Sequence, residues 1–317
     1  MRRDVKVFFA TDIHGSERCY RKFLNAGKVY GVDVLVLGGD VTGKALVPIT
    51  KLSDGTYRGR VEGKEQTIYE DGIADVIATI RNAGLYPFIA TPDEIDHLSQ
   101  NKDALREKFE VVVRKSLVDW VELAHDRAKP NGIDVYIQPG NDDEPAVLDG
   151  MSSDFVVNPE GKVLYLKDTV PMMSYGYSNH TPWDSPRELD EADLEAAYER
   201  MAAQISDMSC AVFNLHVPPK DATIDRCPML DDDLKPIVRA GEIQTFGAGS
   251  TAVRGVIQKY QPIVSLHGHI HESGGMAKIG RTVSINPGSE YSDGILRGAL
   301  VTVDAKKKKV HYQLTSG

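Results

Sequence analysis

The chain has 317 residues, which is about two domains' worth of sequence or one large α/β domain with insertions, at roughly 150 residues per domain. Its 37 Lys and Arg against 46 Asp and Glu give a formal net charge of −9, which argues against wrapping nucleic acid or lying on an anionic membrane. With 41% hydrophobic and 26% charged residues, the composition excludes intrinsic disorder.

Membrane insertion and disulfide bonding are also unexpected. The longest apolar runs fall far short of the ~20 residues that a membrane-spanning helix needs. The cysteines Cys19, Cys210 and Cys227 are odd in number and form no closely spaced pair, which predicts reduced thiols in a cytoplasmic protein. Residues 1–4 lead straight into a strand-like run and do not resemble a signal peptide.

Five short apolar runs along the chain predict buried strands. Each lacks polar alternation, as expected for strands that are covered on both faces of a sheet. The runs are residues 5–9, 34–37, 133–137, 211–215 and 263–266. Further strand-like runs follow at residues 282–285, 299–303 and 310–314, and the last two flank a lysine-rich stretch that we interpret as a solvated hairpin turn.

Helical patterns lie between these runs. Thr91 followed by Pro92 and two acidic residues predicts a helix N-terminus, and the apolar spacing beyond it predicts one long helix over residues 92–129. Asp190 is expected to cap a second helix, whose apolar stripe runs from Leu194 to Met208.

Residues 44–130 stand apart because they form a long connection between two core strands. Within them, Asp54-Gly55 lies between two strand-like runs and is a hairpin signal. We predict one domain over residues 1–317, with residues 44–130 as a hairpin-and-helix subdomain inserted in it. Two interpretations of the subdomain remain open: a surface decoration or oligomer contact, and a cap over the functional site.

Each of the five core runs is followed directly by side chains that can bind a metal ion. These are Asp12, His14, Asp40, Asn141, His216, His269 and His271. Because open α/β sheets bind ligands beyond the carboxyl ends of their strands, we expect these side chains to gather at one rim. Glycines beside most of them allow the backbone to turn sharply near a ligand.

The chemistry of this set suits a pair of metal ions. Imidazoles, carboxylates and one amide, without a thiolate, fit Mn²⁺, Fe, Zn²⁺ or Co²⁺ better than a structural zinc site. Seven candidate ligands are too many for one catalytic ion that must keep open positions, and they suit two ions about 3.5–4 Å apart that share a carboxylate. Asp40 is the expected bridge.

Taken together, the motifs Asp12-x-His14, Gly39-Asp40, Gly140-Asn141, His216 and Gly268-His269-x-His271 resemble the signature of the calcineurin-like metallophosphoesterase superfamily. The resemblance extends over about residues 5–290, and residues 285–289 are similar to its small bacterial and archaeal phosphodiesterases. It implies an α/β fold of two mixed β-sheets in a sandwich flanked by helices. It also implies that Asp12, His14 and His271 hold one ion, that Asn141, His216 and His269 hold the other, and that Asp40 bridges both.

Two positions depart from the family pattern. Asp142 stands where the family often has a histidine that serves the leaving oxygen, and Gly43 stands where it often has an aspartate. Neither change removes a metal ligand, but Asp142 puts protonation of the leaving group in doubt. His180, in a loop before a helix, is the other candidate catalytic residue. Arg297 is a candidate for pairing with a phosphate, and His267 is expected to be structural.

The sequence therefore predicts a metal-dependent phosphoric ester hydrolase that acts on a small-molecule phosphate ester. Phosphodiesters are favoured because of Asp142, and Mn²⁺ is the leading metal. One alternative is a non-catalytic metal-binding scaffold, which the intact ligand set disfavours. The other is a nuclease of the same superfamily, which the net charge disfavours despite one locally basic patch. That patch consists of Lys44, Lys51, Arg58, Arg60 and Lys64, against Asp54 and Glu62. Homo-oligomer formation stays open.

Overall fold

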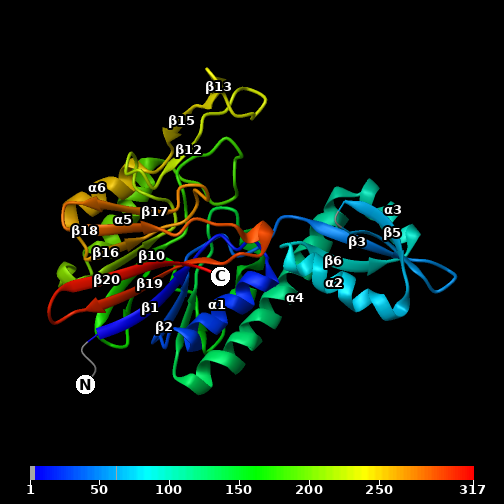
Figure 1. Ribbon diagram of the computed structural model, residues 1–317, viewed down its shortest axis with the longest axis horizontal. Helices are drawn as coiled ribbons and strands as arrows, with labels where there is room; N and C mark the ends of the chain where they lie inside the picture. The colour runs from blue at the N-terminus through cyan, green and yellow to red at the C-terminus, as the bar shows by residue number, and fades with distance from the viewer. Residues whose placement is uncertain (1–3, 62) are drawn as a thin grey trace.

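Two mixed β-sheets packed face to face form the centre of the molecule (Figure 1). The computed structural model describes residues 4–61 and 63–317. The first sheet has the order β20 (Lys309–Ser316), β19 (Arg297–Asp304), β1 (Asp4–Ala10), β2 (Val34–Leu37), β7 (Asp134–Ile137) and β8 (Val156–Val157). Strands β1, β2, β7 and β8 are parallel, while β19 is antiparallel to β1 and forms the predicted C-terminal hairpin with β20.

The second sheet repeats this mixed arrangement. Its order is β17 (Gly275–Ile279), β18 (Thr282–Asn286), β16 (Val264–Leu266), β11 (Val212–Leu215), β10 (Val170–Tyr175) and β9 (Lys162–Leu166). The four central strands are parallel, and each edge strand is antiparallel to its neighbour. The predicted α/β fold of two mixed sheets is confirmed.

Apolar side chains from both sheets fill the space between them. Phe9 and Val36 of the first sheet and Met172 and Leu266 of the second are buried in this shared layer. Because each central strand is covered on its other face by helices, the continuous apolar runs of the sequence correspond to strands buried on both sides.

Helices cover the outer faces of the sandwich. They are α1 (Glu17–Val29) and α4 (Lys102–Ala128) on the first sheet, and α5 (Glu191–Ala202) and α6 (Thr251–Tyr260) on the second. Short 3₁₀ turns are η2 (Lys129–Asn131), η3 (Pro145–Met151), η4 (Met208–Cys210) and η5 (Tyr291–Asp293). Tyr20 of α1 stacks on Trp120 of α4 with ring centroids 4.2 Å apart, which ties the two helices together.

A smaller sheet with two helices projects from the sandwich, at the right of Figure 1. It consists of β5 (Lys64–Ile68), β4 (Tyr57–Val61), β3 (Leu46–Lys51) and β6 (Tyr86–Ala90), with η1 (Glu70–Gly72), α2 (Ile73–Asn82) and α3 (Pro92–Gln100). The predicted hairpin at Asp54 joins β3 and β4. Ile49, Tyr57, Ile68 and Ile80 form a separate small core, so this segment has its own packing.

The long helix predicted over residues 92–129 is in fact two helices. Asn101 adopts an extended conformation between α3 and α4, and its side chain accepts hydrogen bonds from the backbone N–H groups of Asp103 and Ala104. Such a cap ends one helix and begins the next. Because Val113 and Trp120 of α4 belong to the core of the first sheet, the projecting part of residues 44–130 ends near Asn101.

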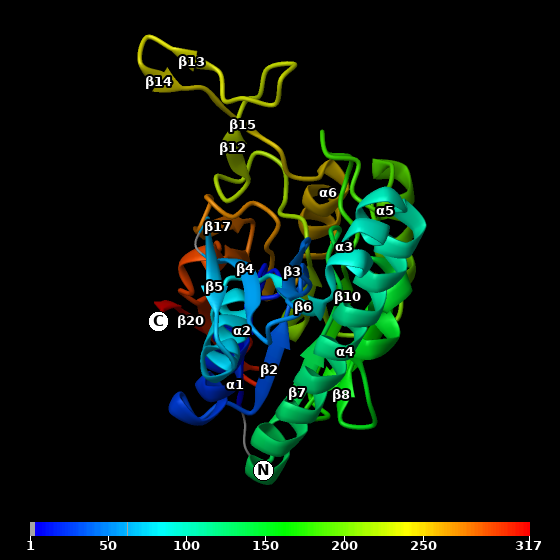
Figure 2. The same ribbon diagram turned by 90° about the vertical axis from the view of Figure 1, so that its right-hand side faces the viewer.

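An arm of four short strands rises above the sandwich, at the top of Figure 2. Its strands are β12 (Arg226–Pro228), β13 (Val238–Arg239), β14 (Glu242–Ile243) and β15 (Thr245–Gly247). Met229 and Phe246 at its base are 40% and 41% exposed, and both line the cavity described below.

Some of the remaining predictions of local structure agree with the structure and others do not. Helix α5 ends at Ala202, before the predicted Met208, although Ile205 still packs against its core. Cys19 and Cys210 are buried, and none of the three cysteines, all within the described residues, is in a disulfide. In the part of the chain described, no helix has the length and apolar character to span a membrane. Residues 1–3 and Glu62 lie outside the described residues. Most of the segment 1–4, from which we predicted the absence of a signal peptide, therefore also lies outside them.

Candidate metal centre

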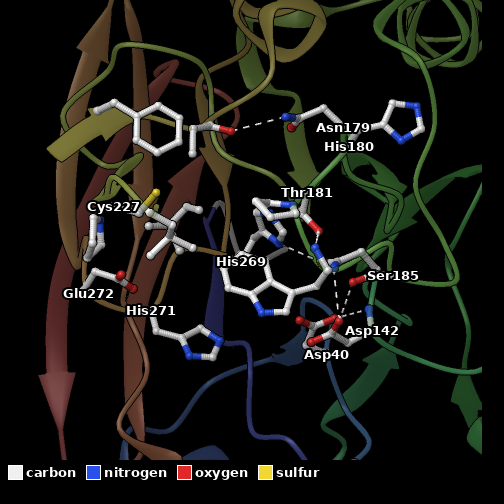
Figure 3. Close-up of a pocket in the computed structure, with 18 of the residues that line it drawn as sticks. Asp40, Asp142, Asn179, His180, Thr181, Ser185, Cys227, His269, His271 and Glu272 are labelled. Atoms are coloured by element: carbon white, nitrogen blue, oxygen red, sulfur yellow. Dashed lines mark hydrogen bonds between the residues drawn. The ribbon is translucent and has the colours of Figure 1, made fainter. Parts of the chain in front are cut away.

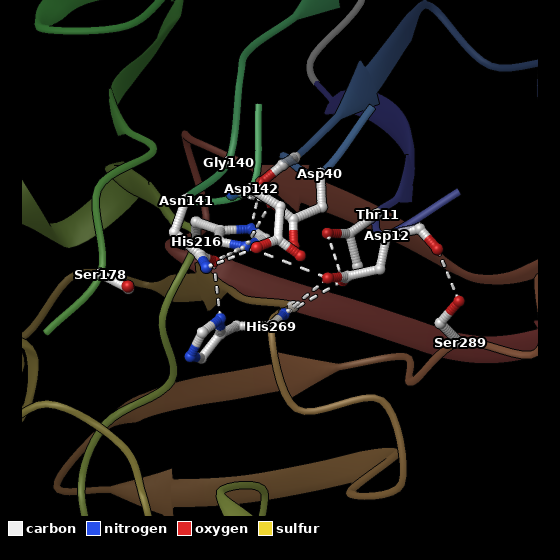
Figure 4. Close-up of polar contacts among 12 residues, drawn as sticks. Thr11, Asp12, Asp40, Gly140, Asn141, Asp142, Ser178, His216, His269 and Ser289 are labelled. Atoms are coloured by element: carbon white, nitrogen blue, oxygen red, sulfur yellow. Dashed lines mark hydrogen bonds and ion pairs between the residues drawn. The ribbon is translucent and has the colours of Figure 1, made fainter. Parts of the chain in front are cut away.

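The loops after five strands meet at one rim of the sandwich, three from the first sheet and two from the second (Figure 4). Strands β1, β2 and β7 lead to Asp12, Asp40 and Asn141, while β11 and β16 lead to His216 and His269. The side chains of these residues point toward one another in Figure 4. The structure thus brings together residues that are more than 250 positions apart in the sequence.

The first group of possible metal ligands consists of Asp12, His14, Asp40 and His271. One ligand atom from each lies within 4.8 Å of the others. His14 Nε2 is 3.1 Å from His271 Nε2 and 3.7 Å from Asp40 Oδ2, and His271 Nε2 is 3.4 Å from Asp12 Oδ1. These nitrogen and oxygen atoms surround a small common volume.

The second group consists of Asp40, His216 and His269, again with ligand atoms within 4.8 Å of one another. The side chain of Asn141 joins them, because its Oδ1 lies 2.7 Å from His269 Nδ1 and 3.1 Å from His216 Nε2. Asp40 is common to both groups. All seven sequence-predicted ligands therefore lie at one centre.

The donor set fits divalent cations. It offers nitrogen and oxygen without sulfur, which suits the catalytic metals of the first transition row. The Nε2 atoms of His14 and His271 are 3.1 Å apart, close enough to bind one cation that lies beside both, since metal–nitrogen bonds are about 2.0–2.1 Å long. His14 Nδ1 is buried and has no hydrogen-bond partner among the described residues, so the ring is oriented by its Nε2 side.

The backbone at the centre is strained in the way that functional sites often are. Asp12, His14, Asp40 and His269 all have positive φ angles, of 52°, 40°, 48° and 66°. Such conformations cost about 1–3 kcal/mol each and persist only where the surroundings enforce them. Here they turn successive side chains inward toward the shared centre.

Two glycines allow the loops to approach so closely. A Cβ atom on Gly39 would lie 2.3 Å from Nδ1 of His216, and one on Gly140 would lie 2.1 Å from Oδ1 of Asp40. Neither contact is sterically possible, because backbone and ligand side chain are already in contact. The glycines of the motifs are thus required by the ligand geometry.

Electrostatics at the centre favour an ionised Asp40 and a neutral His269. Burial raises the pKa of Asp40, but the charge and hydrogen bond of His216 outweigh it and hold that pKa far below its usual range. Burial, together with the charge of His216, lowers the pKa of His269 to about 4, so its imidazole is neutral. Burial alone would lower the pKa of His216, but Asp40 raises it to about 9, which shows how strongly these carboxylates attract positive charge.

Asp143 organises the centre from behind, a role that we did not expect from the sequence. It is fully buried, and its carboxylate accepts hydrogen bonds from the backbone N–H groups of Val41, Thr42 and Gly140, at 3.0, 2.7 and 2.7 Å. Burial, then the charge of Asp40, raise the pKa of Asp143 to about 6. Its only sequence signal is its place in the run Gly-Asn-Asp-Asp.

Arg187 is a second residue that sequence reasoning missed. Only 3% of it is exposed, and its guanidinium donates to the carbonyl of Gly140 at 2.9 Å and pairs with Glu160. The guanidinium also lies 4.1 Å from the ring centroid of Tyr177. Arg187 therefore fixes the loop that carries Asn141, and an isolated arginine in a loop gives no sequence signal for this.

The candidate catalytic residue Asp142 lies beside the centre. Its Oδ1 accepts a hydrogen bond from Ser185 Oγ at 2.8 Å, and its Oδ2 pairs with the ammonium of Lys44. Its backbone N–H donates to Oδ1 of Asp40 at 3.0 Å. Asp142 is thus held close to the shared carboxylate, and Lys44 is its partner.

The other softer candidates have partners of their own. His180, whose side chain is 63% exposed, lies 3.0 Å from Asp190 and 3.5 Å from Glu188, although it borders the cavity described below. Arg297 pairs with Glu290 at 2.7 Å, and its pairing with a phosphate stays a prediction. His267 is buried and bonded to the backbone carbonyl of Leu215 at 2.8 Å, as expected of a structural residue.

A cavity of about 550 Å³ opens above the ligands (Figure 3). Asp40, His269 and His271 form part of its floor, with Asp142 to one side. Much of its wall is apolar and comes from the loop before α5, the base of the arm and the loop after β16. The wall residues are Pro182, Trp183, Cys227, Pro228, Met229, Leu230, Phe246 and Ile270.

Comparisons with known proteins place the fold. No protein-family model matches the chain. Over 157 residues the chain is 28% identical to the uncharacterized protein MJ1162 of Methanocaldococcus jannaschii. The aligned segment covers 49% of this chain and 64% of MJ1162, so the match spans less than two thirds of that protein. TT1561 of Thermus thermophilus aligns over 98% of both chains with a TM-score of 0.53 and 10% identity. An archaeal phosphodiesterase aligns over 98% of this chain and 100% of its own with a TM-score of 0.35 and 11% identity. The match to TT1561 shows a shared fold.

Proposed function

We propose that this chain is a metal-dependent phosphoric ester hydrolase that uses two divalent ions. The observation that carries the proposal is the position of Asp40, which belongs to two adjacent groups of metal-binding side chains at the floor of an open cavity. A shared carboxylate between two such groups is what a two-ion centre requires. The motifs that resemble calcineurin-like metallophosphoesterases support the same reaction.

We propose which residues bind each ion from the two groups in which their side chains lie. Asp12, His14 and His271 would hold one ion, Asn141, His216 and His269 would hold the other, and Asp40 would bridge them. Divalent ions at such a centre supply charge to the phosphoryl oxygens and acidify water. The protein itself orients the side chains that would bind the ions. Asp12, for example, accepts the backbone N–H of His269 at 3.0 Å and so links the two groups.

The cavity favours a small organic phosphate ester. Its floor is polar, whereas Trp183, Met229 and Phe246 offer an apolar surface to the organic part of a substrate. Asp142 stands where the family often has a histidine that serves the leaving oxygen, and the lack of that histidine favours phosphodiesters over simple alkyl phosphates. We therefore propose a preference for phosphodiesters.

The inserted subdomain is proposed to support the centre within a single catalytic domain over residues 1–317. The carbonyl oxygen of His14, in the loop after β1, lies so near Gly84 that a Cβ atom on Gly84 would be 2.3 Å from it. Ser16 Oγ also donates to the carbonyl of Asn82 at 2.8 Å. These contacts favour a direct structural connection to the site over a remote decoration.

The alternatives have less support. A non-catalytic scaffold has no need for a cavity above an intact ligand set. For a nuclease, the basic patch is partly neutralised, since Lys44 pairs with Asp142 and Arg58 lies 3.7 Å from Glu65, while Glu62 lies outside the described residues. The net charge of −9 also opposes binding to nucleic acid. A cytoplasmic location and homo-oligomer formation stay predictions.

The test is to strip the protein of metal and reload it with Mn²⁺, Fe²⁺, Zn²⁺ or Co²⁺. We expect uptake of two equivalents, measured by elemental mass spectrometry, and hydrolysis of bis(4-nitrophenyl) phosphate in preference to 4-nitrophenyl phosphate. Asp40→Asn should lower metal content and abolish hydrolysis, whereas Asp54→Asn, in the exposed hairpin, should change neither. Full activity in Asp40→Asn, or hydrolysis by metal-free protein, would contradict the two-ion proposal.

A further inference from the structure

Asp142 replaces a histidine that would serve the leaving oxygen, and the structure shows a lysine in contact with it. The ammonium of Lys44 pairs with Oδ2 of Asp142, and both residues border the cavity above the ligands. The side chain of Lys44 is 61% exposed and that of Asp142 is 14% exposed. A positively charged group therefore lies beside the carboxylate of Asp142 at the edge of the cavity. The backbone N–H of Asp142 donates a hydrogen bond to Oδ1 of Asp40, which keeps this pair close to the proposed metal centre.

Asp142 is firmly held and so can orient Lys44. Its Oδ1 accepts hydrogen bonds from Ser185 Oγ at 2.8 Å and from Asn141 Nδ2 at 3.3 Å, which leaves Oδ2 for the lysine (Figure 3 shows Asp142 and Ser185). An ammonium that pairs with a fixed carboxylate is restricted to a narrower range of positions.

Lys44 owes its own position to the junction between the core and the inserted subdomain. The preceding residue, Gly43, donates its backbone N–H to Tyr86 Oη at 2.9 Å. A Cβ atom on Gly43 would lie 2.0 Å from the carbonyl oxygen of Gly84, so no aspartate fits there. Both departures from the family pattern thus belong to one arrangement: Gly43 lets the subdomain approach, and the chain beyond it presents Lys44 to Asp142.

Among the described residues that border this cavity, the other cations outside the metal groups have different partners. Lys220 donates to the carbonyl of Gly247 at 2.9 Å, at the base of the arm. His180 pairs with Asp190 and Glu188. Lys44 is the cation that is held beside the residue in the histidine position.

We propose that Lys44 stabilises the leaving oxygen of the substrate and that Asp142 is the positioning residue that holds it there. This inference rests on the proposed phosphoester hydrolysis. Water oxygen forms the new bond to phosphorus, and the bond from phosphorus to the leaving oxygen breaks with its electron pair going to that oxygen. The ammonium of Lys44 donates a hydrogen bond to this oxygen as its charge develops. The proton lost by the attacking water and the proton gained by the leaving group are exchanged with solvent.

The test measures kcat/KM for a series of methyl aryl phosphate diesters whose leaving phenols range from nitrophenol to phenol. A poor leaving group develops more charge and depends more on Lys44. Lys44→Met should lower kcat/KM about 10²-fold for the phenol ester and less than ~10-fold for the nitrophenol ester. Lys44→Arg, which keeps the charge, should restore part of the loss. Asp142→Asn should steepen the dependence on leaving-group pKa in the same direction by a smaller amount.

Two controls separate this role from a structural one. Lys51→Met removes the same charge from β3, outside the cavity, and should leave the series unchanged. Metal content by mass spectrometry and the thermal unfolding midpoint should be the same in Lys44→Met as in the unmodified protein. A slope against leaving-group pKa that does not change in Lys44→Met would overturn the inference while leaving the proposed function intact. Failure of the metal-loaded, unmodified protein to hydrolyse any ester would overturn both.

Discussion

Asp143 links the two loops that supply Asp40 and Asn141. It never reaches the centre, yet its carboxylate gathers backbone N–H groups from residues on both loops, about a hundred positions apart. Ligand geometry at the rim thus depends on a residue behind the ligands as much as on the ligands themselves. In metal sites, partners of this kind often tune affinity nearly as strongly as the ligands do.

We expect Asp143→Ala to destabilise the protein and weaken metal binding. Three buried N–H groups would lose their acceptor, and each unpaired buried donor costs about 1–3 kcal/mol. With some relaxation, the free energy of unfolding should fall by about 2–4 kcal/mol in urea titrations. Asp54→Ala removes a carboxylate that likewise accepts the N–H and hydroxyl of a threonine, but in an exposed hairpin. A loss of equal size in both variants would show that burial of Asp143 does not matter.

The titration of His180 tests whether this residue belongs to the loop or to the reaction. A hydrogen bond to Asp190, with the charge of that residue, raises the pKa of His180 above its ordinary 6.5. Because the folded-state pKa is raised, the contact stabilises the loop fully below about pH 6.5 and is lost as the pH rises through the folded-state pKa. Asp190→Asn should lower the pKa in an NMR titration. No change on that substitution would mean that His180 has another partner.

At the scale of elements, the projecting subdomain touches the centre through one turn. Gly84, between α2 and β6, has a φ of 83°. Its backbone packs directly against the carbonyl oxygen of His14, so that no space is left for a side chain. The subdomain has its own small core, but α4 returns the chain to the main one. We therefore expect a displacement of this turn to move His14, one of the proposed metal ligands.

Substituting Gly84 by alanine should weaken metal binding. Gly55→Ala is a matched control, because Gly55 has a φ of 84° in the same subdomain and nothing lies within 4 Å of its Cβ position. Both variants bear the strain of a left-handed alanine, roughly 1–2 kcal/mol. Only Gly84→Ala also collides with the His14 carbonyl, so only it should lower affinity for the metal in calorimetric titrations. Equal affinities in the two variants would show that the contact does not position His14.

The centre also connects the two halves of the whole molecule. Ligands from β1, β2 and β7 belong to the first sheet, and those from β11 and β16 to the second. Ions bound between them would tie the rims of both sheets together. A ligand that binds only the folded state stabilises it by mass action, by about 2.7 kcal/mol when its free concentration is 100 times Kd.

Removing the metal should therefore lower the thermal unfolding midpoint of the protein. We expect chelator-treated protein to unfold at a lower temperature, with recovery when Mn²⁺ is returned, as followed by calorimetry. Asp40→Ala should show a much smaller response to added metal, because both groups lose a ligand. If Mn²⁺ raised the midpoint of Asp40→Ala as much as that of the unmodified protein, the stabilising ion would be bound elsewhere.

The sequence alone determined the sandwich and the set of side chains proposed as ligands, because both depend on local order. Each buried strand is a short apolar run, and each ligand follows such a run directly, so position in the chain fixes position at the rim. Asp12, Asp40 and His269 needed no knowledge of distant contacts. The break of the long helix at Asn101 was missed because its capping hydrogen bonds compete with a continuous apolar pattern.

Tertiary structure decided the features that depend on contacts between distant segments. The pairing of Lys44 with Asp142 joins residues almost a hundred positions apart, and neither belongs to a periodic pattern. Asp143 and Arg187 act through backbone groups, which carry no sequence signal. Local sequence determines which residues follow a strand. Which neighbour each of their side chains contacts is decided only when the loops pack together, because the distance between two loops depends on glycines such as Gly43.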